Sequence, residues 1–371
     1  MVAGGRAEVL IVGGGPAGLA AALAVRQQGL DVMVADGARS PIDKACGEGV
    51  MPNGIAALRR LGIEISRDAA VPFRGIRFIA SDLAADACFV GDPGWGIRRT
   101  ELHRLLAARA AAAGVRLSWD TPVRGLTAEG VVLDGGPVAC RWIIGADGER
   151  SQVREWAGLG PPGSPSQRFG FRRHFAVAPW TDAVEVYWCR GAQVFVTPVA
   201  PSEVCVALIS RSSRGRLGDV LAACPELERR LAGAPATTPE RGAISASRRL
   251  AAVTRGRLAL IGEASGSIDA VTGEGLSVTF HHALALAEAL AAGDLGRYEA
   301  AHRRILRVPA LMARLLLAMD RSPWLCRRAL RAFAAEAGLF SRLLALHVGT
   351  AASPGRAVGS LCSLGWRLLT V

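Results

Sequence analysis

The fold is decided by the stretch Glu8–Leu19, which reads EVLIVGGGPAGL. Its first five residues are mostly apolar and predict a short buried strand, and the glycines after them predict a tight turn into a helix ending near Gln28. The next apolar run, Leu30–Ala35, predicts a second strand that ends at Asp36. Strand, helix and strand in this order are typical of the parallel β-α-β unit that opens a Rossmann-like domain.

The glycines of this stretch have the spacing Gly13-x-Gly15-x-x-Gly18. Such glycines permit the tight turn, let the backbone approach a pyrophosphate, and let the helix pack closely on the strand. The N–H groups at the start of the helix attract the same anion. Asp36 follows Gly13 by 23 residues, where an acid can accept hydrogen bonds from a ribose. We expect a dinucleotide to be bound here by Gly13, Gly15, Pro16, Ala17, Gly18 and Asp36.

A second match to this pattern, Gly158-x-Gly160-x-x-Gly163, serves as a control. It follows a predicted helix, contains two adjacent prolines and precedes no helix, so it predicts a linker over residues 158–165. The chain therefore has one dinucleotide fingerprint, and a separate Rossmann domain for a nicotinamide is missing.

Two later segments also place an acid and glycines at the end of a predicted strand. Residues 145–154, GADGERSQVR, put Asp147 after a strand, with Ser151 as a helix cap. Residues 262–276 begin with Gly-Glu after an apolar strand and end with TGEGL at the start of a helix. Glycines before a helix N-terminus let the backbone approach a ligand.

The order and spacing of these three segments resemble the large family of FAD-dependent aromatic hydroxylases and geranylgeranyl reductases. The resemblance covers about residues 8–295. It implies that the first segment binds the ADP half of FAD, that the second lies near the flavin and NAD(P)H, and that the third binds the ribityl chain. Glu263 stands where that family usually has Asp, and the segment 95–103, WGIRRTELH, resembles a helix start that places Arg99 against FAD. The further FAD-binding residues implied are Cys46, Gly47, Arg99, Asp147, Gly262, Glu263, Gly273, Glu274, Gly275 and Leu276.

Two loops, ACGEG at 45–49 and TGEGL at 272–276, resemble the geranylgeranyl reductase branch. Its Tyr-x-Trp-x-Phe-Pro strand, which lines a prenyl tunnel, is replaced here by QVFVTP at 193–198. A halogenase would need a relay lysine and a Trp-x-Trp-x-Ile motif; the chain lacks this motif, and its one lysine, Lys44, lies just before Cys46. The overall pattern most resembles single-component hydroxylases encoded with bacterial type III polyketide synthases, which act on alkyl-resorcinol-like lipids.

Hydroxylation of this kind uses dioxygen and needs a dry pocket near the flavin. The helix N-terminus at 273–275 would stabilise the negative edge of the reduced flavin. A base or a cation that favours the phenolate would help a phenolic substrate. The strand at 169–175, FGFRRHF, offers Arg173 and His174 as catalytic candidates.

Alternating apolar and polar residues at 71–90 and 168–210 predict antiparallel strands. The predicted fold is α/β, α+β overall, with an antiparallel β-sheet substrate domain inserted into a Rossmann-like FAD-binding domain and a helical C-terminal region. The predicted bounds are 1–70, 95–165 and 250–300 for the FAD-binding domain, 71–94 and 166–249 for the substrate domain, and 301–371 for the C-terminal region.

The chain has 371 residues and a formal net charge of +12, much of it in residues 301–371, where eleven arginines face only Asp320 and Glu336. Leucines recur between these arginines, which is typical of helices that lie on an anionic membrane surface; a helical cap with solvated arginines is the alternative. Few aromatic residues and no recognised motif argue against nucleic acid.

The eight cysteines lie far apart, without a Cys-x-x-Cys pair, so we expect no metal site and no required disulfide. No run reaches the ~18 apolar residues of a membrane span. We therefore expect a cytoplasmic protein, with peripheral contact at the inner face of the membrane through the basic tail.

Three functions are open at this point. The first is an NAD(P)H-dependent FAD monooxygenase that hydroxylates an aromatic or polyketide-derived substrate such as an alkyl-phenolic lipid. The second is a reductase of prenyl double bonds, and the third is a flavin-binding partner protein without catalysis. An anaerobic assay separates the first two, because only the reductase works without oxygen.

Overall fold

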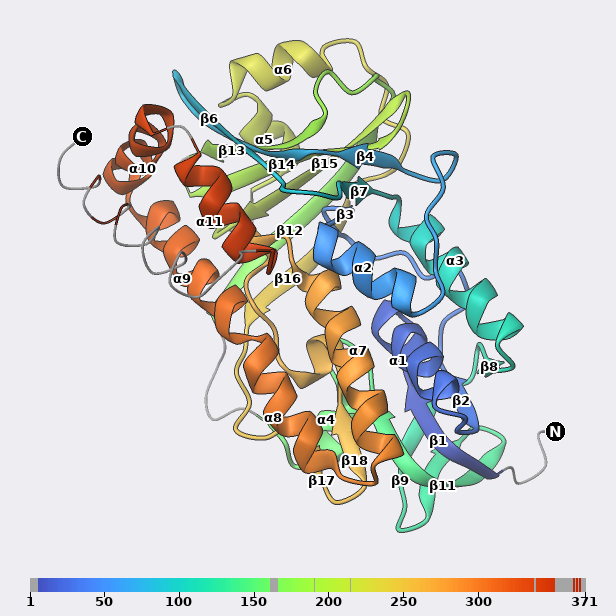
Figure 1. Ribbon diagram of the computed structural model, residues 1–371. Coiled ribbons are helices and arrows are strands. Elements are labelled where there is room, and N and C mark those ends of the chain that lie inside the picture. The colour runs from blue at the N-terminus through green and yellow to red at the C-terminus, as the bar shows by residue number, and fades with distance from the viewer. Residues whose placement is uncertain are drawn as a thin grey trace.

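The computed structural model describes residues 6–160, 166–189, 191–213, 215–336 and 338–350, together with 363, 365 and 367 (Figure 1). These residues form two large sheets, a small third sheet and a helical layer. The second half of the predicted linker, 161–165, and most of the chain beyond 350 lie outside the described residues.

The first large sheet carries the sequence stretch that decides the fold. Its parallel strands lie in the order β18 (Leu258–Leu260), β11 (Gly136–Gly145), β1 (Arg6–Val12), β2 (Val32–Ala35) and β8 (Arg116–Ser118). β17 (Thr254–Arg255) adds an antiparallel edge, and β9 (Val123–Leu126) and β10 (Gly130–Leu133) extend from β11. The central strands are apolar because both faces of a parallel sheet are covered. The predicted Rossmann-like architecture is confirmed.

Helices cover this sheet and form the largest core. α1 (Pro16–Gln27) is buried from Gly18 to Val25, because it lies between the sheet and α7 (Gly275–Ala291). The other helices of this half are α2 (Pro52–Arg60), α3 (Arg99–Ala112), α4 (Gln152–Trp156) and α8 (Leu295–Ile305). The short 3-10 helices η1 (Gly262–Ser265) and η2 (Ala270–Thr272) connect β18 to α7.

The second large sheet has seven strands. Their order is β16 (Arg241–Ser247), β12 (Ser166–Phe175), β15 (Glu203–Ser210), β14 (Ala192–Ala200), β13 (Ala183–Cys189), β5 (Gly75–Ala80) and β6 (Leu83–Cys88). Neighbouring strands are antiparallel as predicted, except that β13 and β5 pair in parallel. These two strands come from separate passages of the chain through the sheet, so no hairpin constrains their direction. α5 (Leu217–Leu221) and α6 (Pro225–Leu231) cover one face.

A small sheet joins the two halves of the molecule. It consists of β3 (Gly49–Val50), β7 (Gly94–Gly96) and β4 (Val71–Phe73). β3 follows the loop that contains Cys46, and β7 leads directly into α3. The cysteine loop and the start of α3 are therefore fixed to each other.

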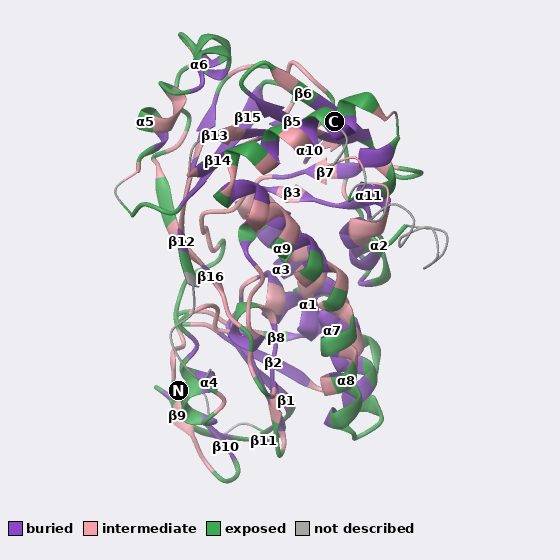
Figure 2. Cartoon of the chain, turned by 90° about the vertical axis from the view of Figure 1, so that its left-hand side faces the viewer, coloured by how far each residue is buried: buried purple, intermediate pink, exposed green. Residues whose placement is uncertain are grey.

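The C-terminal helices pack on the other face of the seven-stranded sheet (Figures 1 and 2). They are α9 (Arg307–Arg321), α10 (Pro323–Ala335) and α11 (Leu339–His347). The ring of Phe340 lies 4.6 Å from that of Phe78 on β5 and 4.7 Å from that of Phe333 on α10. The buried carboxylate of Asp320 accepts a hydrogen bond from Gln193 and lies 3.8 Å from Arg168, so α9 is tied to β14 and β12.

This packing corrects one expectation about the tail. The leucines between the arginines of the tail were expected to lie on a membrane, but Leu315 and Leu316 of α9 line an interior cavity, whose other walls include the seven-stranded sheet. Leu311, one turn before Leu315, is 38% exposed. Among the described residues, no helix has the length and apolar character needed to cross a bilayer.

Candidate functional site

A cavity of about 930 Å³ extends from the carboxyl ends of β1 and β2 to the inner face of the seven-stranded sheet. This is near the upper end of the ~300–1,000 Å³ usual for small-molecule sites. The three predicted segments line one end of it, as expected for loops at the carboxyl edge of a parallel sheet. Of the sixteen residues predicted to bind FAD, fifteen line the cavity, and Gly18 does not.

The three glycines of the first segment have different surroundings. Gly13 has a φ of +108°, and a Cβ there would lie 2.5 Å from the carbonyl oxygen of Ala146. A Cβ on Gly18 would lie 1.8 Å from the carbonyl oxygen of Gly13, so both positions require glycine for the turn and for helix packing. A Cβ on Gly15 would meet nothing within 4 Å. Gly15 therefore leaves open space in the cavity at the start of α1.

Two side chains hold this glycine turn in place. Asp36 accepts hydrogen bonds from the backbone N–H groups of Gly14 at 2.6 Å and Ala38 at 2.7 Å. His103, which the sequence analysis did not single out, donates from Nε2 to the carbonyl oxygen of Gly14 at 2.9 Å. Burial lowers the pKa of His103, so its ring is neutral and α3 is linked to the turn without an added charge.

The second and third segments are held together as one unit. Asp147 accepts hydrogen bonds from the Ser151 hydroxyl at 2.5 Å and the Val153 N–H at 3.1 Å, and Ser151 caps α4 as predicted. The buried guanidinium of Arg154 donates to the carbonyl oxygens of Glu149 at 2.7 Å and Ala264 at 3.1 Å. This segment therefore positions the loop that follows β18.

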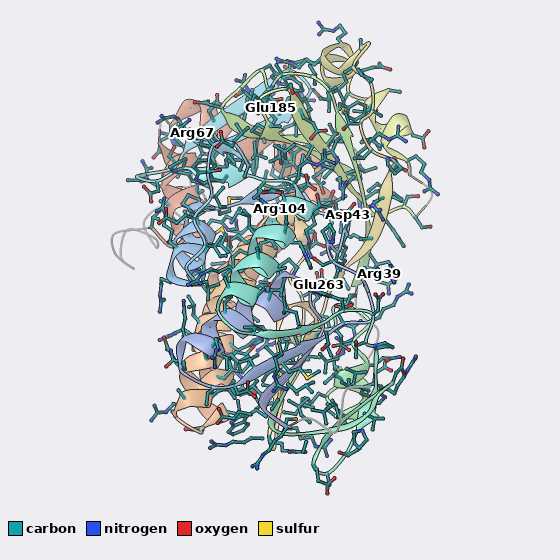
Figure 3. The ribbon with its side chains drawn as sticks, turned by 90° about the vertical axis from the view of Figure 1, so that its right-hand side faces the viewer. Arg39, Asp43, Arg67, Arg104, Glu185 and Glu263 are labelled. Atoms are coloured by element: carbon teal, nitrogen blue, oxygen red, sulfur yellow. The ribbon has the colours of Figure 1, made fainter. Side chains whose placement is uncertain are left out.

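Glu263, at the end of that strand, lies at the border of the cavity (Figure 3). It forms an ion pair with Lys44, the only lysine of the chain, and its side chain is 46% exposed. A half-exposed carboxylate here can accept a hydrogen bond from a ligand hydroxyl.

The two predicted catalytic residues do not line the cavity, which corrects their expected placement beside the substrate. His174 is fully buried, and its Nε2 lies 2.6 Å from Glu48 Oε2. Its Nδ1 lies 3.2 Å from Arg172, which can only donate, so Nδ1 accepts and Nε2 donates to Glu48. Arg173 points to the opposite face of β12, because side chains alternate along a strand.

Glu48 is the centre of this buried cluster, and sequence reasoning missed it. It is 2% exposed and adopts a φ of +59°, which is rare for a residue other than glycine. Its Oε1 accepts a hydrogen bond from the backbone N–H of Arg99 at 3.0 Å. Arg172 also donates to Asp43. Glu48 therefore fixes the backbone of Arg99, the residue that the family resemblance places against FAD.

These residues fit an FAD molecule. The start of α1 has no side-chain cap, so its N–H groups are free for an anion beside the open space at Gly15. The buried Nε of Arg99 has no hydrogen-bond partner among the described residues, and Arg99 lines the same cavity. The start of α7, where Gly273, Gly275 and Leu276 lie, also has no side-chain cap. The ADP half would lie at α1 and the flavin ring near α7.

The far end of the cavity is apolar, and most of it was not foreseen. Its walls come from β5, β13 and β14 and from the three C-terminal helices. In α9 the lining positions have the spacing i, i+3, i+4, i+7, a signal visible in the sequence. The lining side chains include Ile76, Phe78, Val184, Val186, Phe195, Met312, Leu315, Leu316, Met319, Phe333, Phe340, Leu343 and Leu344.

Gly15→Val should yield protein without FAD, because the valine fills the space through which a pyrophosphate approaches α1. Gly125→Val is the matched control, since its Cβ also meets nothing within 4 Å but Gly125 does not line the cavity. The measurement is the FAD content of the purified proteins by absorbance. Full FAD content in Gly15→Val would disprove the assignment.

Glu263→Ala should weaken FAD binding, because it removes a charged acceptor for a ribityl hydroxyl. The loss of one such hydrogen bond costs about 1.5–3 kcal/mol, or roughly ten- to a hundredfold in Kd. Glu274→Ala should change FAD affinity much less. Fluorescence titration of the protein with FAD measures both, and equal affinities of wild type and Glu263→Ala would contradict the assignment.

Comparison with known proteins agrees with this site. The family model described as FAD binding domain matches residues 6–301. The menaquinone reductase of Mycolicibacterium smegmatis is 29% identical over 336 residues, which cover 81% of this chain and 80% of its own. Digeranylgeranylglycerophospholipid reductase 1 of Methanothermobacter thermautotrophicus is 32% identical over 168 residues, or 41% of each chain.

The fold is also shared with a solved structure. A geranylgeranyl bacteriochlorophyll reductase-like protein from Thermoplasma acidophilum has a TM-score of 0.77 at 19% identity, covering 99% of this chain and 98% of its own. The family match spans the glycine turn, the two later segments and the inserted sheet. The chain therefore belongs to the FAD binding domain family, as an FAD-dependent oxidoreductase.

Proposed function

We propose that the protein is a reductase that saturates a double bond in the isoprenoid chain of a lipid, with NAD(P)H as the source of electrons. The observation that carries this proposal is the apolar end of the cavity, which is continuous with the FAD-binding end. Burial of a hydrocarbon chain there is favourable by about 25 cal/mol per Å² of apolar surface. A small polar aromatic substrate would not use these walls.

The names of the two reductases in the comparison support the same substrate class. One acts on menaquinone and the other on a digeranylgeranyl lipid. Their named substrates differ in the head group and share an isoprenoid chain. That shared chain is the part of the substrate for which the apolar walls of this cavity are suited.

The residues of the chain have separable roles in this reaction. Bound FAD supplies hydride transfer. Gly15 and Arg99 would hold the pyrophosphate side of FAD, while Asp36 and Glu263 would accept hydrogen bonds from its sugar and ribityl hydroxyls. The C-terminal helices exclude water from the hydrocarbon, since their apolar side chains close the far wall of the cavity.

A second candidate is hydroxylation of an alkyl-phenolic lipid, and one observation favours it. Gln193 and Thr197 occupy positions where geranylgeranyl reductases have bulky aromatic side chains. Gln193 is buried and contacts Arg168 and Asp320, and Thr197 lines the cavity. The smaller Thr197 leaves room for an aromatic ring. The link to hydroxylases of type III polyketide synthase pathways stays a prediction.

An anaerobic assay with NADPH and menaquinone, or a geranylgeranyl lipid, should give a product that has gained two hydrogen atoms per double bond. Mass spectrometry measures the product. A gain of one oxygen atom that depends on dioxygen, with an alkyl-phenol as substrate, would decide for the hydroxylase. No oxidation of NADPH or NADH with any of these lipids would decide for a flavin-binding partner protein.

We also propose that the outer face of α9 and α10 contacts anionic membranes, which would bring such a lipid to the cavity. Arg307, Arg314 and Arg321 lie along the exposed side of α9 and form no ion pair within the described residues. Leu311 is exposed between them, and Trp324 at the start of α10 is 63% exposed. Cations interleaved with exposed apolar side chains suit a lipid headgroup layer.

Arg314→Gln/Arg321→Gln should weaken binding to anionic vesicles by roughly thirtyfold, since each arginine near such a surface contributes about 1 kcal/mol. The matched control, Arg67→Gln/Arg104→Gln, removes the same charge from the side seen in Figure 3, away from α9 and α10. Co-sedimentation with anionic and neutral vesicles across a salt series measures binding. Equal binding of both double variants would contradict the proposal.

A further inference from the structure

Glu274 lies at the point where the two ends of the cavity meet. It precedes α7 in the TGEGL loop, lines the cavity and is 1% exposed. Its Oε1 accepts a hydrogen bond from Asn53 Nδ2 on α2 at 3.3 Å. Its Oε2 has no hydrogen-bond partner among the described residues. A carboxyl oxygen that is buried without a partner in a cavity wall calls for a functional explanation.

The other carboxylates of the cavity are already engaged. Each accepts hydrogen bonds or pairs with a cation within the described structure, and they are Asp36, Glu48, Asp147, Glu149 and Glu263. Among the described lining residues, Glu274 is thus the carboxyl group with a buried oxygen that has no hydrogen-bond partner.

A histidine of the last described helix, α11, faces Glu274. Nδ1 of His347 on α11 lies 3.5 Å from Glu274 Oε2, and its Nε2 lies 3.0 Å from the carbonyl oxygen of Thr272. A carbonyl only accepts, so Nε2 carries a proton and Nδ1 is the ring nitrogen that faces Glu274. A proton between Nδ1 and Oε2 would satisfy both atoms, because neither has a hydrogen-bond partner among the described residues.

Burial also favours the protonated form of the Glu274 carboxyl. Desolvation raises the pKa of this carboxyl, while His347 from α11 and the amide of Asn53 from α2 lower it by smaller amounts. The net shift is upward, so Glu274 keeps its proton to a higher pH than an ordinary glutamic acid.

We propose that Glu274 is the general acid that protonates the substrate, and that His347 is the positioning residue that holds its carboxyl. This inference rests on the proposed reductase function. The π electrons of the double bond would form a new C–H bond with the Oε2 proton at one carbon, and the Oε2–H bond would break. The hydride that the other carbon needs is the chemistry that bound FAD, reduced by NAD(P)H, would supply. The substrate gains two electrons from the cofactor, and solvent returns the proton to Glu274.

The test compares wild type with Glu274→Gln, and Glu288→Gln is the control. Glu288 is exposed on the same helix, next to Arg60. Infrared spectroscopy across a pH series should detect in wild type and in Glu288→Gln a protonated carboxyl group that persists to a higher pH than an ordinary glutamic acid, and Glu274→Gln should lack this band. Anaerobic reduction of menaquinone should fall about a hundredfold or more in Glu274→Gln, as general acids contribute ~10²–10⁴. Its FAD content and melting temperature should be unchanged.

His347→Gln separates positioning from packing. Glutamine keeps an N–H donor near Thr272 but removes the group that lowers the pKa of Glu274, so the infrared band should persist to higher pH than in wild type. An unchanged pH dependence would overturn the role of His347. If the infrared band survives in Glu274→Gln, the band does not belong to Glu274 and the proposed general acid is wrong. If wild type shows the band but reduces no lipid without oxygen, the proposed reductase function is wrong, and the acid role fails with it.

Discussion

The buried carboxylate of Glu48 is the interaction on which the geometry of the site depends. It joins three parts of the chain that are far apart in sequence: the cysteine loop, the start of α3 and strand β12. Removal of one partner from a buried charged pair typically costs about 3–5 kcal/mol, because the remaining group loses its compensation. Glu48 also adopts a left-handed backbone conformation, which is unfavourable for a residue with a side chain and persists only where the surrounding contacts impose it.

From this centre the two halves of the cavity acquire different properties. On the cofactor side, helix starts and carboxyl groups converge at the ends of parallel strands, so the surface is polar and rich in donors. On the substrate side, one face of an antiparallel sheet meets a helical layer, and both contribute apolar side chains. The reaction would take place where the cofactor side and the substrate side of the cavity meet.

Local sequence was sufficient for the cofactor side and insufficient for the substrate side. The glycine turn and the two strand-ending acids are local signals, and the topology of a parallel sheet brings their loops together. In the Arg172–His174 run, by contrast, every residue is polar, so alternation along β12 could not say which side chains face inward. The partner of His174 is 126 positions away and leaves no local trace.

The sequence of α9 correctly indicated a helix with one apolar side, but the expectation that this side contacts a membrane was wrong. Periodicity identifies an apolar stripe, but a lipid surface and a β-sheet satisfy that stripe equally well. Only the tertiary structure, in which this stripe of α9 lines the cavity, distinguishes the two. The arginines on the outer side remain exposed, so the helix has an apolar face toward the cavity and a cationic face toward its surroundings.

The helical layer also has an evolutionary consequence. The family match ends at residue 301, whereas His347 and one part of the far wall of the cavity are contributed by residues after it. The strands that form the other part of this wall, β5, β13 and β14, lie within the matched stretch. Substitutions after residue 301 can therefore change the shape of the substrate end without touching the loops that bind the cofactor, provided that the contact between Asp320 and Gln193 is retained.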